Sequence, residues 1–543
     1  MSPIVTKILE RRGITAAELE NFLHPTLDKL AKPEELPGIV KAADIILDSI
    51  LYRRKIVVFG DYDCDGVCAT AIISRTLRAL GGTVSEFIPD RLTEGYGMGE
   101  ASIARMLKDN PGVGLVVTVD NGINSVAEVT NLKRKWSSVV VTDHHLPGAE
   151  LPDANAIVDP KLDAPPHLQD LCGAGVAFML ANRVVSEAKR RGMYKGPSIG
   201  GPLLILAGLA TVTDIMPLLG QNRILVSEAL KRFFTCAPMG LKELHARAAR
   251  TGVNELTTRD FGFMIGPRIN AVGRIERFGA AQALELVVSE DQEIVRELAR
   301  LVDGYNVERK AIEQKMSDEA LAKVVPGAPA QVIDLPDGHP GVAGIVAARV
   351  MEKVGGRGPV CVYAGGHGSA RAPEGFNVRD AFVACDEVLE RYGGHAAAGG
   401  FGVKEGRIDD FRRMLCEYCE RLASADVAPQ KKENEPDLWI EQADLTLELA
   451  EELRQLEPFG EGNREPVFGL KGVLFADVKP LGMDGKHLSA TLRGSGLRAV
   501  WWGHGDLVEK LRAESAAPHD IAFALAVSDY GERHAELRLV SIA

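Results

Sequence analysis

The chain has 543 residues, too many for one ordinary core and enough for three or four domains. Its 46% hydrophobic and 25% charged residues are typical of a globular protein, and no segment offers the roughly twenty unbroken apolar residues of a membrane span. We therefore expect a cytoplasmic location. Eight cysteines argue against a disulfide scaffold, and the net charge of −12 disfavours a polyanionic ligand unless the charge reverses locally.

The predicted elements begin with a helical, polar leader over residues 1–45. From Lys55 onward, apolar strand-like segments alternate with segments of helical period. Strands that alternate with helices through short loops form a parallel sheet covered on both faces. We therefore predict a doubly wound α/β domain over 46–285. Its expected strands lie at 55–61, 83–89, 113–120, 137–143 and 155–159.

A long, charged helical pattern at 286–325 predicts a helix that connects this domain to a second, smaller α/β domain at 326–423. The segment 424–437 is small, polar and charged, as expected of a linker. From 438 to 543, short β-like segments separated by Gly and Asp turns predict a β-barrel. The OB-fold is the type of barrel that fits best.

Acidic motifs follow three of the predicted strands where each strand ends. DYDCDG (61–66) follows the first strand, VDNG (119–122) ends the third, and TDHH (142–145) ends the fourth. Because ligands bind at the carboxyl ends of parallel strands, these distant loops should share one edge. Any single Asp after a strand is as often a helix N-cap as a ligand. Three acid-rich strand ends with a His pair favour a functional site.

The chemistry of these side chains indicates a metal centre. Carboxylate oxygens with one or two imidazoles suit manganese or magnesium better than structural zinc. About six ligands are more than one divalent ion takes from protein, whereas two ions about 3.5–4 Å apart would use them all, as in phosphodiester hydrolysis. The candidate ligands are Asp61, Asp63, Asp65, Asp120, His144 and Asp214.

These motifs resemble those of the DHH phosphoesterase family, and an Asp at the start of the first motif resembles its single-strand-specific exonuclease branch. The resemblance covers nearly the whole chain. It implies a DHH domain, a DHH-associated domain and an OB-fold-like domain that binds nucleic acid. It also implies a 5′→3′ exonuclease that hydrolyses single-stranded DNA to mononucleotides in DNA repair and recombination. The further motifs that carry it are DRLTEGYGM, LCGAGVAF, GPRINAVGR, GSARAPEGFNVRDA, GGHAAAGGF and LEPFGEGNREPVF.

The resemblance also assigns roles in the metal centre, with manganese preferred and magnesium as a substitute. His145 would contact the phosphate or support a ligand, and Asp143 would orient a histidine. The implied ligands are Asp61, Asp63 and Asp120 for one ion, and Asp65, Asp120, His144 and Asp214 for the other.

A second cluster of motifs is basic and rich in glycine. Glycines let a backbone approach phosphates closely, and arginine binds them bidentately. Taken alone, each arginine is as often a surface ion pair as a substrate contact. The resemblance favours contact, because the associated domain would face the metals across a cleft and hold the 5′ end of the strand. The expected substrate-binding residues are Arg91, Arg268, Arg274, Ser369, Arg371, Asn377 and His395.

The predicted barrel would hold the single-stranded DNA beyond the cleft. Trp501 and Trp502 are neighbours in a strand and must face opposite sides, so at most one could stack on DNA, and we expect both in the barrel core. A helicase and a single-strand-binding protein are the other partners that the resemblance suggests.

Two alternatives remain open. The first is a DHH-family phosphodiesterase that acts on short oligonucleotides or cyclic dinucleotides. The second is an inactive scaffold that only binds DNA. The region 435–543 favours a long polymer substrate over the first, and the complete set of acidic residues disfavours the second.

Overall fold

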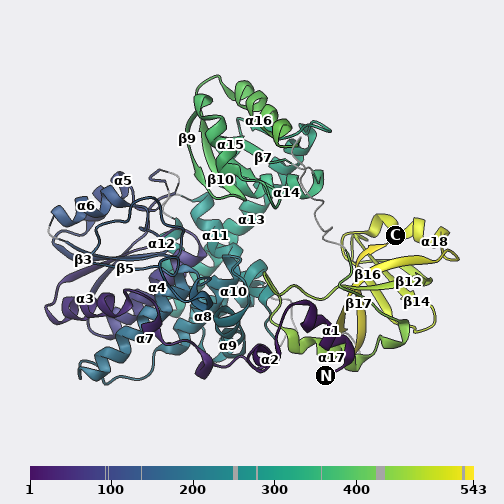
Figure 1. Cartoon of the computed structure of the whole chain (residues 1–543), viewed down its shortest axis with the longest axis horizontal. Coiled ribbons are helices and arrows are strands. Elements are labelled where there is room, and N and C mark those ends of the chain that lie inside the picture. Colours follow the sequence, from purple (N-terminus) through teal and green to yellow (C-terminus); the bar gives the residue numbers. More distant parts are fainter. Residues whose placement is uncertain are drawn as a thin grey trace.

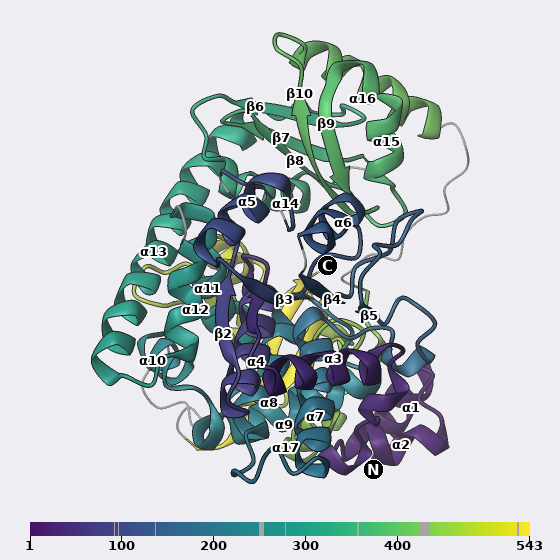
Figure 2. The ribbon, with the colours of Figure 1, turned by 90° about the vertical axis from the view of Figure 1, so that its left-hand side faces the viewer.

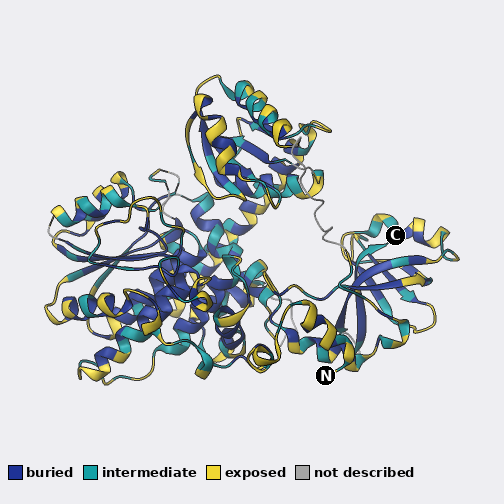
Figure 3. Ribbon diagram, viewed as in Figure 1, coloured by how far each residue is buried: buried dark blue, intermediate teal, exposed yellow. Residues whose placement is uncertain are grey.

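The computed structural model describes residues 1–542 except 92, 96, 136, 249–254, 277–278, 356–357, 424–434 and 529–531. Most of the predicted linker therefore lies outside the described residues. The chain forms three lobes, each with its own buried interior (Figures 1 and 3). Within the described ranges, no helix combines the length and apolar character that a membrane crossing requires.

The first lobe contains a five-stranded parallel sheet in the order β2-β1-β3-β4-β5. Alternate residues of each central strand enter two different cores: Val117 packs with the helices on one face, and Val116 with those on the other. This explains why the strands are continuous apolar runs. The strands are β1 (Lys55–Phe59), β2 (Thr83–Phe87), β3 (Val113–Val119), β4 (Ser138–Thr142) and β5 (Ala156–Val158).

Helices cover both faces of this sheet. The core on one face is shared with α3 (Ile39–Leu51), α4 (Cys64–Ala79) and α7 (Gly173–Arg190). The core on the other face is shared with α5 (Glu100–Asp109) and α6 (Val126–Arg134). Further helices complete the lobe, namely α8 (Gly200–Thr213), α9 (Gly220–Cys236), α10 (Met239–Ala248), α11 (Gly266–Ile275) and α12 (Gly279–Val288).

A single helix of 31 residues, α13 (Gln292–Ala322), links the first lobe to the second (Figure 2). The second lobe has a mixed sheet in the order β6-β7-β8-β10-β9. Its strands are β6 (Gln331–Leu335), β7 (Val360–Ala364), β8 (His367–Arg371), β9 (Leu389–Gly394) and β10 (Ala398–Val403). Its helices are α14 (Ala343–Val354), α15 (Val378–Ala384) and α16 (Ile408–Ala423).

The third lobe is a barrel-like sheet in the order β11-β12-β16-β17-β15-β14-β13. β12 and β13 are almost continuous in sequence and lie near opposite ends of this order, which is the closure expected of an OB-fold. The described lobes thus confirm the predicted fold class. The strands are β11 (Leu438–Trp439), β12 (Phe468–Val473), β13 (Phe475–Leu481), β14 (His487–Leu492), β15 (Arg498–Trp501), β16 (His519–Ser528) and β17 (His534–Ile542), with α18 (Val508–Ala513) between β15 and β16.

The two tryptophans differ. Trp501 is buried at the end of β15, as predicted, but Trp502 is 53% exposed, so the prediction was wrong for Trp502. The strand ends at Trp501 and side chains alternate between the two faces, so the next side chain points away from the core.

The first two helices of the leader belong physically to the third lobe. These helices, α1 (Pro3–Arg11) and α2 (Ala16–Leu23), share a hydrophobic core with α17 (Leu447–Leu453) and the barrel strands. Arg223 of α9 fastens this assembly to the first lobe, since its buried guanidinium donates to the carbonyls of Phe22, Leu456 and Glu457. Burial lowers the pKa of Arg223 to about 10.

Candidate metal centre and substrate cleft

The first strand-end loop is built by a helix cap. Asp63 is the N-cap of α4, and its Oδ1 accepts from the backbone N–H groups of Asp65 (3.0 Å) and Gly66 (3.1 Å). A Cβ at Gly66 would lie 2.5 Å from the carbonyl oxygen of Asp61, so only glycine allows the turn. The N-cap interpretation and the metal-ligand interpretation of these aspartates therefore hold together, because capping uses one oxygen of Asp63.

Asp65 reaches a different helix. Its two carboxylate oxygens accept from the N–H groups of Gly173 (2.6 Å) and Ala174 (2.7 Å) at the start of α7. A Cβ at Gly173 would lie 2.6 Å from the Cβ of Asp120, so this glycine lets the helix end approach the acids. Positive backbone N–H groups at the helix N-terminus stabilise the buried carboxylate.

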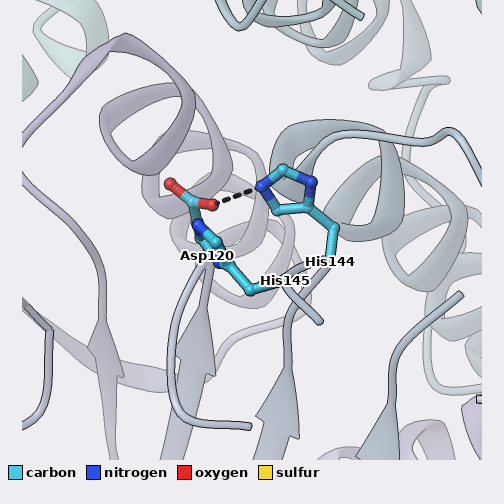
Figure 4. A group of neighbouring side chains, drawn as sticks. All are labelled: Asp120, His144 and His145. Carbon is cyan, nitrogen blue, oxygen red and sulfur yellow. Dashed lines mark ion pairs between the residues drawn. The ribbon is translucent and has the colours of Figure 1, made fainter. Parts of the chain in front are cut away.

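His144 is the centre of the cluster. Its Nε2 lies 3.1 Å from Asp120 Oδ1, 3.6 Å from Asp65 Oδ2 and 3.7 Å from Asp214 Oδ2. Figure 4 shows Asp120 and His144 pointing toward each other above the strand ends. Asp120 holds its position with a positive φ of 61°. Three groups have ligand atoms within 4.8 Å of one another: Asp61, Asp63 and Asp120; Asp65, His144 and Asp214; and Asp120, His144 and His145.

Asp143 orients the second histidine. Its Oδ1 lies 2.7 Å from His145 Nδ1 and accepts from the N–H groups of His144 and His145, while Oδ2 accepts from that of Ile123. Burial alone would lower the pKa of His145, but the hydrogen bond to Asp143 and the surrounding carboxylates outweigh it and raise that pKa to about 9. Against its own burial, Asp143 has a lowered pKa because of the same hydrogen bond.

The carboxylates of Asp61, Asp120 and Asp214 lie close together without enough positive charge nearby to balance them. Burial and the neighbouring Asp63 raise the pKa of Asp61 to about 7, and burial with Asp65 and Asp63 raises that of Asp214 to about 9. Burial and four other aspartates raise the pKa of Asp120 well above its usual value. Oδ1 of Asp61 and Oδ1 of Asp120 are buried and accept no hydrogen bond from the described residues, although the latter makes the ion-pair contact with His144. Buried oxygens without donors fit divalent cations, so the residues present suit the metals.

A cavity of about 710 Å³ separates this centre from the second lobe. Asp61, Asp120 and His145 line it on one side, and Ser369 and His395 line it on the other. The rings of His145 and His395 are nearly parallel, at 11°, with their centroids 6.2 Å apart. The cavity therefore brings the acid motifs and the glycine-rich motifs face to face.

The predicted substrate-binding residues divide into two groups. Arg91, Ser369 and His395 line the cavity, and the Arg91 guanidinium lies 4.5 Å from the centroid of the Tyr62 ring. The other four do not line it. Arg268 pairs with Asp303 of α13, Arg274 donates to the carbonyl of Gly341, Arg371 packs against Gly344 of α14, and Asn377 caps α15.

The structure also adds cavity residues that were not predicted from the sequence: Asn121, His367, Arg391 and Tyr392. Asn121 follows the candidate ligand Asp120 directly. Arg391 lies four residues before His395 in the motif ERYGGH, so the neighbouring motif was a usable signal. His367 lies two residues before Ser369, and alternation along a strand would have placed them on one face.

Comparison with protein families gives three matches along the chain. The N-terminal domain of the DHH family matches residues 55–201, the DHHA1 domain matches 327–421, and the RecJ OB domain matches 436–540. The fold and the acid cluster thus define a DHH-type protein with an associated domain and an OB domain.

Similar proteins of known function indicate the branch of the DHH family to which the chain is related. The chain is 35% identical over 523 residues to the single-stranded-DNA-specific exonuclease RecJ of Bacillus subtilis and 34% identical over 495 residues to that of Salmonella typhimurium. These alignments cover 94% and 86% of this chain, and 64% and 83% of the relatives. The chain also covers 66% of the RecJ of Thermus thermophilus, so it spans about two thirds of two of these relatives.

A solved structure agrees with these matches. The crystal structure of Thermus thermophilus RecJ in complex with Mn²⁺ superposes with a TM-score of 0.84 at 32% identity, over 100% of this chain and 76% of that one. The chain belongs to the RecJ family of single-stranded-DNA-specific exonucleases.

Proposed function

We propose that this protein is a 5′→3′ exonuclease that hydrolyses single-stranded DNA to mononucleotides. The observation that carries the proposal is the cavity with a cation-deficient acid cluster on one wall and glycine-rich motifs on the other. Family membership supports this substrate, and the relatives so named act on single-stranded DNA. DNA repair and recombination are the processes we propose for it.

The residues would hold two divalent ions, with manganese preferred. Asp61, Asp63 and Asp120 form one ligand group, and Asp65, His144 and Asp214 form the other. Bound there, the ions would supply a water of lowered pKa and positive charge beside the phosphate. Manganese-bound and magnesium-bound RecJ structures among the relatives support this choice of metals.

The remaining residues act on the strand. His145, held protonated by Asp143, would donate to a phosphate oxygen, and His395 would approach the same group from the second lobe. Arg91 adds a guanidinium on the first wall. The OB domain would bind the strand farther along. A helicase and a single-strand-binding protein remain predicted partners.

The test is a time course with manganese on single-stranded DNA labelled at either end, with a duplex and an RNA dinucleotide as controls. Mononucleotide release from the 5′ end of the single strand is the expected result. Release from the 3′ end would contradict the direction, and cleavage of the dinucleotide alone would move the substrate to short oligonucleotides. Binding without cleavage would indicate a scaffold.

A further inference from the structure

One face of the second sheet has a floor of glycines. Gly400 of β10 pairs with Ser369 of β8 on one side and with Gly393 of β9 on the other. Gly402 lies two residues farther along β10 and pairs with Arg391 of β9. The Arg391 side chain crosses over Gly402, since a Cβ at Gly402 would lie 3.0 Å from Arg391 Cγ. Glycine at this position therefore lets the arginine lie across the central strand.

Arg391 meets His367 on the far side of that glycine. Arg391 Nη2 lies 2.9 Å from His367 Nδ1. A guanidinium can only donate, so Nδ1 accepts, and the ring is the neutral tautomer with its proton on Nε2. Burial and the nearby charges of Arg391 and Arg91 lower the pKa of His367, in agreement with a neutral ring. The hydrogen-bonding groups that the two side chains still offer to a ligand are therefore all donors.

The pair lies in a positive environment that opens into the cavity. Both residues are exposed and line the cavity. Arg91, on the opposite wall, also lines it, and its charge acts on His367. In the part of the chain that the structure describes, Arg391 contacts His367 and forms no ion pair with a carboxylate. Arg391 and the Nε2–H of His367 are donors that pair with no carboxylate in the described structure, and such a pair fits an anion.

The position of the pair separates it from the metal centre. His395 donates its N–H to the carbonyl of Ala398, at the end of β10 where the His395 ring faces His145. Gly402 is four residues farther along β10, which corresponds to about 13 Å at the rise of a strand. One phosphate group cannot reach both places. An anion beside Arg391 would therefore be a different group from the phosphate beside the metals.

We propose that Arg391 and His367 form a subsite for a phosphate of the single-stranded substrate other than the one that is hydrolysed. This subsite rests on the proposed function. The glycine floor between the two places leaves room for a nucleotide to lie against backbone. The phosphate is either the 5′-terminal one or an internal one, and the two sources can be separated by experiment.

The first test is steady-state kinetics of Arg391→Met on matched oligonucleotides with a 5′-phosphate or a 5′-hydroxyl. Loss of a hydrogen bond to a charged group should raise KM about tenfold or more, with kcat little changed. A loss confined to the 5′-phosphorylated strand assigns the terminal phosphate, and an equal loss on both assigns an internal phosphate. An unchanged KM on both strands overturns the subsite.

Control variants separate this role from folding. Arg413→Ala removes an exposed arginine of α16 in the same lobe, which pairs with Asp410 and Glu417 outside the cavity, and should leave KM unchanged. His367→Ala should raise KM less than Arg391→Met, because the guanidinium remains. Arg391→Lys should restore part of the affinity through charge alone.

Calorimetry without metal separates the subsite from the proposed function. The probes are thymidine 3′,5′-bisphosphate and thymidine. Wild type should prefer the bisphosphate, and Arg391→Met should lose that preference even if wild type proves unable to hydrolyse single-stranded DNA. In that case only the proposed function fails. If wild type hydrolyses the strand but the variant retains both KM and the preference, only the subsite fails.

Discussion

The two walls of the cavity are built in opposite ways. On the wall of the first lobe, Asp120 and Asp143 are only 3% and 1% exposed, and backbone N–H groups hold Asp143 in place. On the wall of the second lobe, His367, Arg391 and His395 are exposed on a floor of glycines. A cluster of buried anions is costly unless cations compensate it, whereas exposed donors cost little. The first wall is thus fixed for metals, and the second is open for a ligand that comes and goes.

The largest expected effect is that of replacing Asp120. If this residue could be replaced without loss of activity, the first wall would not be built for metals. Asp120→Asn keeps the shape of the side chain but removes a charge that belongs to two of the three ligand groups. Because loss of outer-shell partners of metals already costs about 10–100-fold, we expect turnover to fall by more than about 100-fold. Turnover in manganese and manganese affinity by calorimetry are the measurements. Wild-type turnover would contradict a shared ligand.

Asp143→Asn tests the residue that orients His145 on the first wall. The amide cannot hold His145 protonated as the carboxylate does, so we expect a loss of about 10–100-fold in kcat. The pH profile should also change, since the pKa of His145 falls from about 9 when its partner is neutral. Asp153→Asn is the matched control, because Asp153 is an exposed aspartate paired only with Lys133 in the described structure. A similar loss in both variants would point to general destabilisation.

Arg371→Ala tests the support behind the second wall. Arg371 does not line the cavity but packs against Gly344 of α14, and its strand β8 also carries the cavity residue Ser369. We expect KM for single-stranded DNA to rise by up to about tenfold, through the position of Ser369, while manganese affinity stays at the wild-type value. Both quantities are measured on the same preparation. An equal loss of manganese affinity would place Arg371 with the metal centre and erase the division between the walls.

The smallest expected effect concerns stability and pH. Asp61 and Asp214 have pKa values of about 7 and about 9 in the fold, above those of an unfolded chain. The metal-free fold therefore loses stability as pH rises from about 4 toward 9. Manganese requires the deprotonated forms and offsets this loss, so the increase in Tm on adding it should be larger at pH 8.5 than at pH 6.5. At 100 times Kd the stabilisation is about 2.7 kcal/mol, or several degrees. An equal increase at both pH values would contradict the raised pKa values.

The sequence predicted what depends on local order along the chain. The acid motifs follow their strands directly, and a parallel sheet must bring such strand ends to one edge, so the position of the metal centre follows from the order of strands and motifs alone. Contacts between distant segments could not be predicted in this way. Asp65 binds the start of α7, 108 residues away, and Arg391 meets His367 only because β10 lies between their strands. Strand order and register decide such contacts, and neither can be inferred from spacing. The prediction for Trp502 failed for a similar reason, because the end of β15 was not visible in the pattern.

The packing of the leader has a consequence for how the protein is made. Val5, Ile8 and Leu9 are buried in the same core as Ile521 and Leu537. On the ribosome, domains generally fold in the order of synthesis. The first helix cannot do so, because the residues that hold its two ends, Glu452 and Asn463, are translated about 450 residues later. The first helix therefore remains an exposed amphipathic segment while the first two lobes fold. We expect a chaperone to bind the nascent chain during this time.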